Sequence, residues 1–389
     1  MSQRKTVLFT LLLACLVLGA GLAVYLWQSG RGGAARQAAQ ESNPEVVNAN
    51  AAAAPPTLDA DIPAVVATVL PAGETTRLGS SPMPTVHAGS VDRFEADLRY
   101  ARFVLRETDL EIQDVFDVPL TRTYNSNDFA PPNPVHAFGK NTNHPYDIAP
   151  LGSRFPYTYQ MIVLEDGDFL YFDRISKGTS YSDAVYQHTE TSTSFYKALQ
   201  QWNGYGWTTR LADGSQIVFP MSDTAVTLSQ GAPIEMRDPQ GNRLILQRDA
   251  KHNLQQITTP HGRFLKFIYD DWWRIVRAED DMGAWVRYEY SPEGMLTSAI
   301  SSSGRERRFS YEGVRMTRVT DERGSVLVQN WYDQGRLVRQ KFGNGEVYSY
   351  SYRMSPNGLY AMSAIVTLPN GSKKTVELAD SVPGFVKQQ

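Results

Sequence analysis

The chain has 389 residues, a formal net charge of −3 and 20% charged residues. This length suits one or two domains, and so small a charge gives no electrostatic case for binding nucleic acid. The single cysteine, Cys15, excludes an intrachain disulfide framework and any metal site built from cysteines.

The first predicted element is a membrane anchor over residues 1–28. Residues 6–27 carry no charged side chain, and a helix of that length spans the roughly 30 Å hydrocarbon core of a bilayer. We therefore expect an uncleaved transmembrane helix. Two alternatives stay open: cleavage as a signal peptide after residues 21–23, and lipidation at Cys15, which ends a loose lipoprotein box.

Basic residues flank this helix on both sides. Arg4 and Lys5 precede it, and Arg31 and Arg36 follow it. Because basic residues concentrate on the cytoplasmic side of membranes, the first pair favours an N-terminus inside the cell and the second pair opposes it. The expected location is the inner (cytoplasmic) membrane, crossed once, with the C-terminal body in the periplasm or outside.

Residues 29–90 are predicted to form a disordered tether. They are rich in alanine, proline, serine, glycine and asparagine, and they contain no aromatic residue. A segment of this composition buries too little apolar surface to order itself. The tether would hold the folded body away from the membrane.

Residues 91–237 are aromatic and strand-like without a period, which indicates an irregular β-rich domain. A short helix is expected within residues 91–106, because four apolar residues there are spaced for one helical face. These residues are Phe94, Leu98, Ala101 and Leu105. Residues 165–168 and 212–215 are predicted to be hairpin turns, since both contain an Asp-Gly pair.

Residues 238–354 repeat at intervals of 20 or 21 residues. The landmarks are Gly241, Gly262, Gly283, Gly304, Gly324 and Gly345, and then Tyr269, Tyr290, Tyr311, Tyr332 and Tyr352. A fixed period of this length marks a repeat architecture.

Each repeat is predicted to be one β-hairpin. Its first arm alternates, so that Val286, Tyr288 and Tyr290 face one way and Trp285, Arg287 and Glu289 the other. The second arm opens with an apolar residue in all five copies: Leu254, Ile275, Leu296, Met316 and Leu337. Three residues further on stand Ile257, Ala278, Ala299, Val319 and the single polar exception, Gln340. The predicted fold is therefore all-β, a meander of hairpins.

These residues resemble the RHS, or YD-repeat, family, which includes the teneurin-like shells. Residues 332–337 read YDQGRL, a near-complete copy of the family unit, while residues 269–275 keep the Tyr-Asp and lack the Gly. Residues 119–126 and 151–152 resemble the segment that precedes the repeats in RHS proteins. The resemblance implies a β-rich N-terminal domain followed by a hairpin meander.

In RHS proteins, many repeats enclose a C-terminal toxin that is cut free near a conserved Asp-Pro-x-Gly-Leu. Residues 355–359 read SPNGL, which lacks the Asp and matches the turn at residues 291–294. The tail, residues 355–389, is predicted to add strands at 364–368 and 374–378. It is too short for a toxin, so we expect a short membrane-anchored form without a toxin domain.

No catalytic, cofactor or metal site is predicted. His136 and His144 share a loop with Asp147, which makes a metal site conceivable, but a solvated loop is the simpler interpretation. The carboxylates of residues 165–168 and 279–281 could suggest acid/base pairs or calcium ligands. They lie in predicted turns, where aspartate caps the backbone.

The candidate ligand-stacking residues are Trp272, Trp273, Trp285 and Trp331. Exposed aromatic rings beside polar groups can stack on sugar rings, and Trp285 and Trp331 point away from the tyrosine face. The alternative, which we favour, is that both faces of the sheet are partly buried.

The sequence as a whole favours a membrane-anchored, envelope-facing, non-enzymatic protein. Its partner would be another protein or a surface glycan, with no cofactor and no nucleic acid. A glycan-acting hydrolase that uses turn carboxylates, and a remnant of a toxin sheath, are the alternatives. Paired, buried carboxylates at separations of about 5–10 Å would favour the hydrolase.

Overall fold

The computed structural model describes residues 96–126, 136–191, 193–222 and 225–378, which all belong to one compact unit. The predicted anchor at residues 6–27, Cys15 and the tether at residues 29–90 lie outside the described residues. Within the described ranges, no helix is long and apolar enough to cross a bilayer.

The first strands form a small antiparallel sheet, which we call the inner sheet. Its strands pair in sequence order: β1 (Ala96–Asp97), β2 (Arg102–Gln113), β3 (Asp117–Asn125) and β4 (Thr142–Asn143). The helix expected within residues 91–106 is therefore wrong for the described part. Ala101 has a φ of 54°, which breaks any helix between β1 and β2. The spacing of the apolar residues suggested a helix because the start of β2 is buried on both faces, so its sequence lacks the alternation expected of a strand.

The remaining strands form one antiparallel ladder in which each strand pairs with the next along the chain. The strands before the repeats are β5 (Ala149–Gly152), β6 (Tyr159–Val163), β7 (Phe169–Arg174), β8 (Val185–Gln187), β9 (Leu199–Trp202), β10 (Gly206–Arg210), β11 (Gln216–Pro220) and β12 (Glu235–Arg237). Two short 3-10 helices, η1 (Pro145–Asp147) and η2 (Leu228–Gly231), lie between strands.

The repeats supply β13 (Arg243–Arg248), β14 (Leu254–Thr258), β15 (Phe264–Tyr269), β16 (Ile275–Asp280), β17 (Trp285–Tyr290), β18 (Leu296–Ser301), β19 (Glu306–Glu312), β20 (Arg315–Asp321), β21 (Val326–Asp333), β22 (Arg336–Phe342) and β23 (Val347–Met354). The tail adds β24 (Ala361–Thr367) and β25 (Lys373–Glu377). The predicted hairpin meander is confirmed, and the predicted turns at residues 165–168, 212–215 and 355–359 each join two strands.

The landmarks of the repeat each have a structural task. The six repeat glycines have φ between 80° and 90°, which glycine adopts without steric cost. Each landmark tyrosine donates its hydroxyl to the carbonyl that opens the second arm of the preceding hairpin. The pairs are Tyr269–Leu254, Tyr290–Ile275, Tyr311–Leu296, Tyr332–Met316 and Tyr352–Leu337, at 2.6–2.9 Å. The tyrosine therefore links consecutive hairpins.

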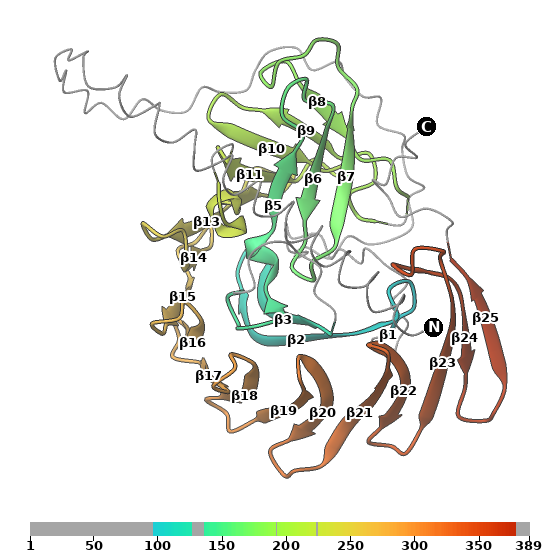
Figure 1. Ribbon diagram of the computed structural model, residues 1–389. Coiled ribbons are helices and arrows are strands. Elements are labelled where there is room, and N and C mark those ends of the chain that lie inside the picture. Colours follow the sequence, from blue (N-terminus) through green and yellow to red (C-terminus); the bar gives the residue numbers. More distant parts are fainter. Residues whose placement is uncertain (1–95, 127–135, 192, 223–224, 379–389) are drawn as a thin grey trace, which may run out of the picture. The chain divides into compact units, whose positions relative to one another are not determined.

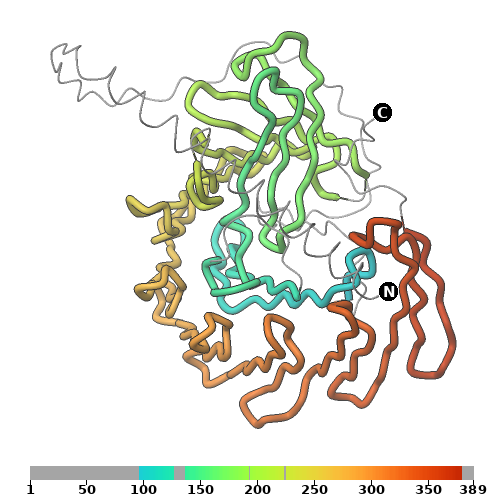
Figure 2. Tube along the Cα trace, viewed as in Figure 1, coloured from blue at the N-terminus to red at the C-terminus, as the bar shows by residue number. Residues whose placement is uncertain are grey.

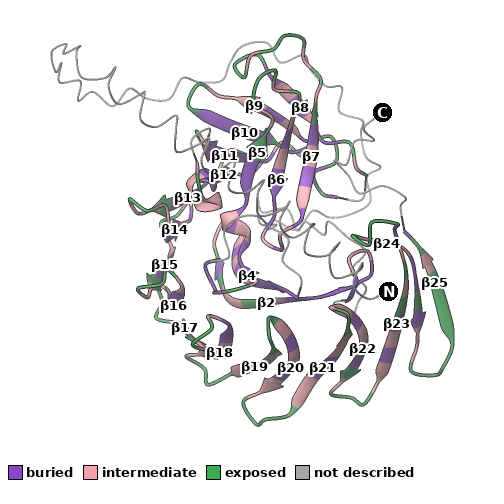
Figure 3. Cartoon of the chain, in the orientation of Figure 1, coloured by how far each residue is buried: buried purple, intermediate pink, exposed green. Residues whose placement is uncertain are grey.

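The predicted core face of the hairpins is buried. Val286 and Tyr288 are 2% exposed, whereas Glu289 is exposed. The second-arm landmarks are all buried as well, and exposed residues gather at the hairpin turns (Figure 3). Gln340, the polar exception, is buried because its amide donates to Asn330 and accepts from the hydroxyl of Tyr350.

The ladder curves around the inner sheet (Figures 1 and 2), and β2 contacts β16, β17 and β22. Backbone bonds join the two sheets where the second arm of a hairpin begins. The amides of Ile275, Leu337 and Ala361 donate to the carbonyls of Ala137, Ala101 and Arg99, respectively. Each of these amides lies at a register shift that frees it from the ladder. Two amides of the repeats and one of the tail thus donate to the segments that flank strands β1, β2 and β4 of the inner sheet.

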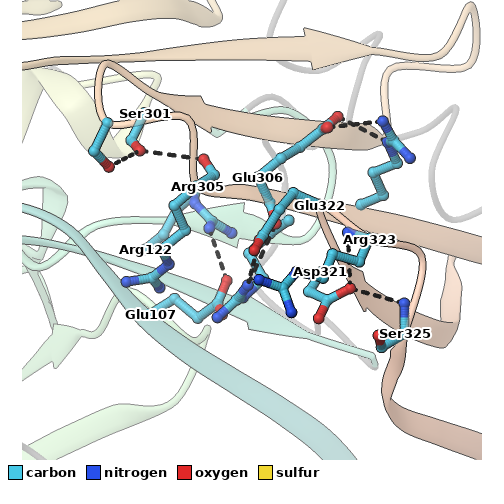
Figure 4. A network of polar contacts seen from close by, with 12 residues as sticks. Glu107, Arg122, Ser301, Arg305, Glu306, Asp321, Glu322, Arg323 and Ser325 are labelled. Atoms are coloured by element: carbon cyan, nitrogen blue, oxygen red, sulfur yellow. Dashed lines mark hydrogen bonds and ion pairs between the residues drawn. The ribbon is translucent and has the colours of Figure 1, made fainter.

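Ion pairs also join the inner sheet to the hairpins (Figure 4). Arg122 is 1% exposed and bonds Asp109 at 2.7 Å and Glu107 at 3.1 Å. Glu107 in turn bonds Arg307 of β19 at 3.1 Å, and Asp109 accepts the hydroxyl of Tyr288 at 2.8 Å. A fully buried arginine therefore lies at the centre of the contact between the two sheets.

Candidate functional site

The turn between β15 and β16 places two large aromatic side chains at its tip. Trp272 is 72% exposed and Trp273 is 42% exposed. Asp270 fixes this turn, since its Oδ1 accepts the amides of Trp272 and Arg274 at 2.9 Å and its Oδ2 pairs with the Arg274 side chain. We call this element the tryptophan hairpin.

Trp273 has an unusual backbone. Its φ is 63°, in the left-handed region, and its amide donates to the carbonyl of Asp270. At the same point of a neighbouring hairpin stands Gly294, whose φ is 88° and whose amide donates to Ser291. A bulky residue in this region costs on the order of 1–3 kcal/mol, and such strain concentrates at functional sites.

The two tryptophans line separate hollows. Trp273 lines a hollow of about 500 Å³, which we call the Trp273 groove. His136, Asp147, Lys251 and Tyr269 line it as well. The ammonium group of Lys251 lies 3.5 Å from the centre of the Trp273 ring. Polar residues also line it: Thr227 and Ser229 at the start of η2, and Asn253 in the turn between β13 and β14.

Trp272 lines a second hollow, of about 510 Å³, which we call the Trp272 groove. Its walls include Lys140, Arg274, Tyr290 and Glu293. The guanidinium group of Arg274 lies 4.4 Å from the centre of the Tyr290 ring, which fixes both side chains. Each groove thus combines an exposed indole with charged and hydrogen-bonding groups.

The other two candidate tryptophans lie on strands away from this turn. Trp285, at the start of β17, is half-buried and has the guanidinium of Arg277 4.6 Å from its ring centre. Trp331 of β21 is likewise half-buried, with Arg339 at 4.7 Å. These rings therefore pack against arginines of the neighbouring strands.

The two loop histidines are buried, so the expected solvated loop is wrong. His136 is 9% exposed and His144 is fully buried among the rings of Phe138, Tyr146 and Phe267, whose centres lie 5.8–6.2 Å away. Neither ring nitrogen of His144 has a hydrogen-bond partner among the described residues. Within those residues, no group of three or more His, Cys, Asp or Glu side chains is placed to hold a metal ion.

Burial makes His144 a source of pH-dependent stability. It lowers the pKa of His144 from 6.5 to about 4. Below about pH 6.5, His144 therefore binds a proton in the unfolded chain but stays neutral in the folded chain, which favours unfolding. The folded state is fully stable with respect to this group above pH 6.5 and loses that stability as the pH falls towards 4. A pKa shift of this size corresponds to about 3 kcal/mol of unfolding free energy.

We expect His144→Phe to remove this pH dependence, because phenylalanine fits the aromatic surroundings and does not titrate. The free energy of unfolding of the two full-length chains, measured by denaturant titration at pH 7 and pH 4.5, checks this. The natural chain should lose more stability than the variant between the two pH values. An equal loss in both chains would show that His144 does not titrate in this range.

The turn carboxylates fall into two groups. Asp280 and Asp213 accept backbone amides of their own turns, and Asp281 pairs with Arg263 at 3.1 Å, which agrees with turn chemistry. Asp166 likewise accepts an amide of its own turn, that of Asp168, at 3.1 Å. Both side chains are also buried and make ion pairs, Asp166 with Arg106 at 2.7 Å and Asp168 with Arg102 at 2.6 Å. The inner sheet, which was not foreseen, supplies both arginines.

Comparisons with known proteins give structural neighbours only. No protein-family model and no curated protein matches the chain. Among solved structures, it is similar to TcdB2–TccC3 without the hypervariable C-terminal region (TM-score 0.31, 12% identity, 67% of this chain) and to TcdB2–TccC3 (TM-score 0.30, 12% identity, 67%). It is also similar to the Photorhabdus luminescens Tc holotoxin pore (TM-score 0.25, 11% identity, 69%). The chain spans 15–17% of the length of those chains.

Proposed function

We propose that this chain is an RHS-like repeat protein, anchored in the inner membrane by residues 6–27, whose body faces the envelope and binds surface glycan at the tryptophan hairpin. The observation that carries the proposal is Trp273, a bulky residue held in a strained left-handed conformation where Gly294 serves the neighbouring hairpin. The preceding hairpin has His252 at the equivalent point, with a φ of 68°, so a non-glycine residue recurs at this position. Trp273 differs from both neighbours because it presents a large aromatic ring, 42% exposed, at the tip of its turn.

The linings of the two grooves favour a sugar over an apolar ligand. Binding sites generally combine aromatic walls with a few convergent polar groups that fix the orientation of the ligand. The Trp273 groove has Lys251, Asn253 and Asp147 around its indole. A sugar ring presents an apolar C–H face to an indole and hydroxyl groups to such polar neighbours.

The test is a printed panel of bacterial envelope glycans probed with the full-length protein in detergent. We expect Trp272→Ala and Trp273→Ala each to weaken binding by roughly 30-fold, which corresponds to about 2 kcal/mol for an exposed aromatic anchor. Trp273→Gly should weaken binding to the same extent without lowering the free energy of unfolding, because it removes the strain.

Trp285→Ala is the matched control, since its ring packs on Arg277, and it should bind like the natural chain. Absence of binding to every glycan, or full binding by the Trp272 and Trp273 variants, would contradict the proposal. Capture of a protein by the hairpin, lost in the same two variants, would instead make the ligand a protein partner.

A hydrolase is the second candidate, and one observation favours it. Burial, reinforced by the charge of Asp166, raises the pKa of Glu165 to about 7, and a general acid needs a pKa close to the working pH. Against this, the neighbouring Asp166 is held by Arg106. Release of reducing sugar from a bound glycan, abolished in Glu165→Gln, would establish the hydrolase, and we expect no release from the natural chain.

A further inference from the structure

A third hollow lies far along the chain from the tryptophan hairpin, among strands β5–β11. It has a volume of about 250 Å³ and is lined by Gln160, Tyr157, Tyr181, Trp202 and Trp207. We call it the Gln160 pocket. Drug-sized ligands need about 300 Å³ or more, so this pocket suits a smaller unit.

One wall of the Gln160 pocket is a continuous series of aromatic rings. The ring centres of Tyr157 and Tyr181 are 5.9 Å apart, those of Tyr181 and Trp202 are 5.0 Å apart, and those of Trp202 and Trp207 are 5.5 Å apart, all edge to face. Edge-to-face contacts are the preferred geometry for such rings. Tyr181 remains 39% exposed at the rim, so the series ends in an accessible ring.

Arg174 holds the two loops that carry this wall. Its guanidinium donates to the carbonyl of Tyr157 at 3.2 Å and to that of Ser180 at 3.0 Å, and it pairs with Asp183. Tyr157 itself has a φ of 56°, a strained conformation for a bulky residue. The protein therefore holds Tyr157 and Tyr181 together at a cost in backbone strain.

Gln160 gives the pocket a polar group that the fold does not use. The residue is 6% exposed, and its Oε1, which is closed off from solvent, has no hydrogen-bond partner among the described residues. Buried polar atoms are almost always paired, so an unpaired one needs an explanation. A half-turn of the amide exchanges Oε1 with Nε2, so Gln160 can present an acceptor or a donor to a bound hydroxyl group.

We propose that the Gln160 pocket binds a single sugar residue of a glycan. The aromatic wall matches the apolar face of a sugar ring, and the amide of Gln160 matches the hydroxyl groups at its edge. This site is separate from the tryptophan hairpin, and the two can be tested independently.

The experiment is ligand-observed saturation-transfer NMR on the full-length protein in detergent. The probes are methyl glycosides of the common hexoses, N-acetylhexosamines and uronic acids at millimolar concentration. We expect saturation of the ring protons of at least one glycoside. The signal should fall to background in Gln160→Leu and Tyr181→Ala.

Gln160→Leu also separates function from folding. A buried polar atom without a partner destabilises the folded chain, so replacing the amide with an apolar side chain should leave the melting temperature equal to or above that of the natural chain. Removing a residue that serves binding at the expense of stability commonly has this effect. Tyr205→Ala, which removes a 70% exposed ring outside the pocket, is the matched control and should keep the signal.

The outcomes distinguish this site from the tryptophan hairpin. Loss of the signal in Gln160→Leu but not in Trp273→Gly supports the Gln160 pocket whatever the hairpin binds. Loss in Trp273→Gly with full signal in Gln160→Leu overturns the pocket and leaves the proposed function standing. Absence of saturation for every glycoside also overturns the pocket.

Discussion

Arg122→Met is expected to lower the free energy of unfolding by about 3–5 kcal/mol, because removing one partner of a buried ion pair leaves uncompensated charge in the interior. Arg122 is 1% exposed, and its loss leaves Asp109, 7% exposed, with only the hydroxyl of Tyr288 among the described residues. Glu107, 14% exposed, keeps Arg307 alone of these residues. The measurement is denaturant unfolding of the full-length chain, followed by tryptophan fluorescence.

Arg308→Met is the matched control. Arg308 also pairs with a glutamate, Glu306, at 2.7 Å, but its side chain is 55% exposed, and exposed pairs contribute about 0–1 kcal/mol. Neutralising both carboxylates in the Arg122→Met background, with Glu107→Gln and Asp109→Asn, should restore part of the lost stability. Equal effects of Arg122→Met and Arg308→Met would mean that the buried pairs do not hold the inner sheet in place.

The repeats could be predicted from the sequence because the contacts that determine them join residues close together in the chain. Alternation along β17 placed Val286 and Tyr288 in the core, and the periodic glycines placed the turns. Residues of this kind depend on contacts within one hairpin or with the next. Even the polar exception, Gln340, followed from the phase of the repeat, although its partners did not.

The inner sheet could not be predicted because its surroundings are distant in the sequence. The start of β2 is buried on both faces by segments far away in the chain, so its residues show no alternation. The burial of Arg102 and Arg122 could not be predicted for the same reason, since their partners lie on other segments. His144 read as part of a proline-rich loop, yet Phe267 of a remote strand lies against it.

Part of the candidate site could be predicted from the sequence. The sequence showed that the repeat at residues 269–275 lacks its turn glycine, and the structure adds that Trp273 takes a positive φ there. What the sequence could not show is that residues 136–140 border both grooves, since more than a hundred residues separate them from the hairpin. The Gln160 pocket was missed because its aromatic rings follow no period.

Tyr290→Ala is expected to cost about 3–5 kcal/mol of unfolding free energy, the usual effect of truncating a large aromatic side chain in a core. The ring packs against the core and beneath Arg274, and its hydroxyl donates to the carbonyl of Ile275 at 2.6 Å. Tyr290→Phe removes only that hydrogen bond and should cost about 1 kcal/mol. The two variants together separate the packing of the ring from its link to the preceding hairpin.

Glu289→Ala is the control that tests the phase of the strand. Glu289 is adjacent to Tyr290 but lies on the opposite, exposed face, where it pairs with Arg287 at 3.1 Å. Because one step along a strand reverses the side chain, its removal should change stability by no more than about 0.5 kcal/mol. Denaturant unfolding of the three full-length variants measures the difference. Equal costs for Glu289→Ala and Tyr290→Ala would mean that both faces of β17 are buried, and a larger cost for Glu289→Ala would reverse the register of the whole repeat.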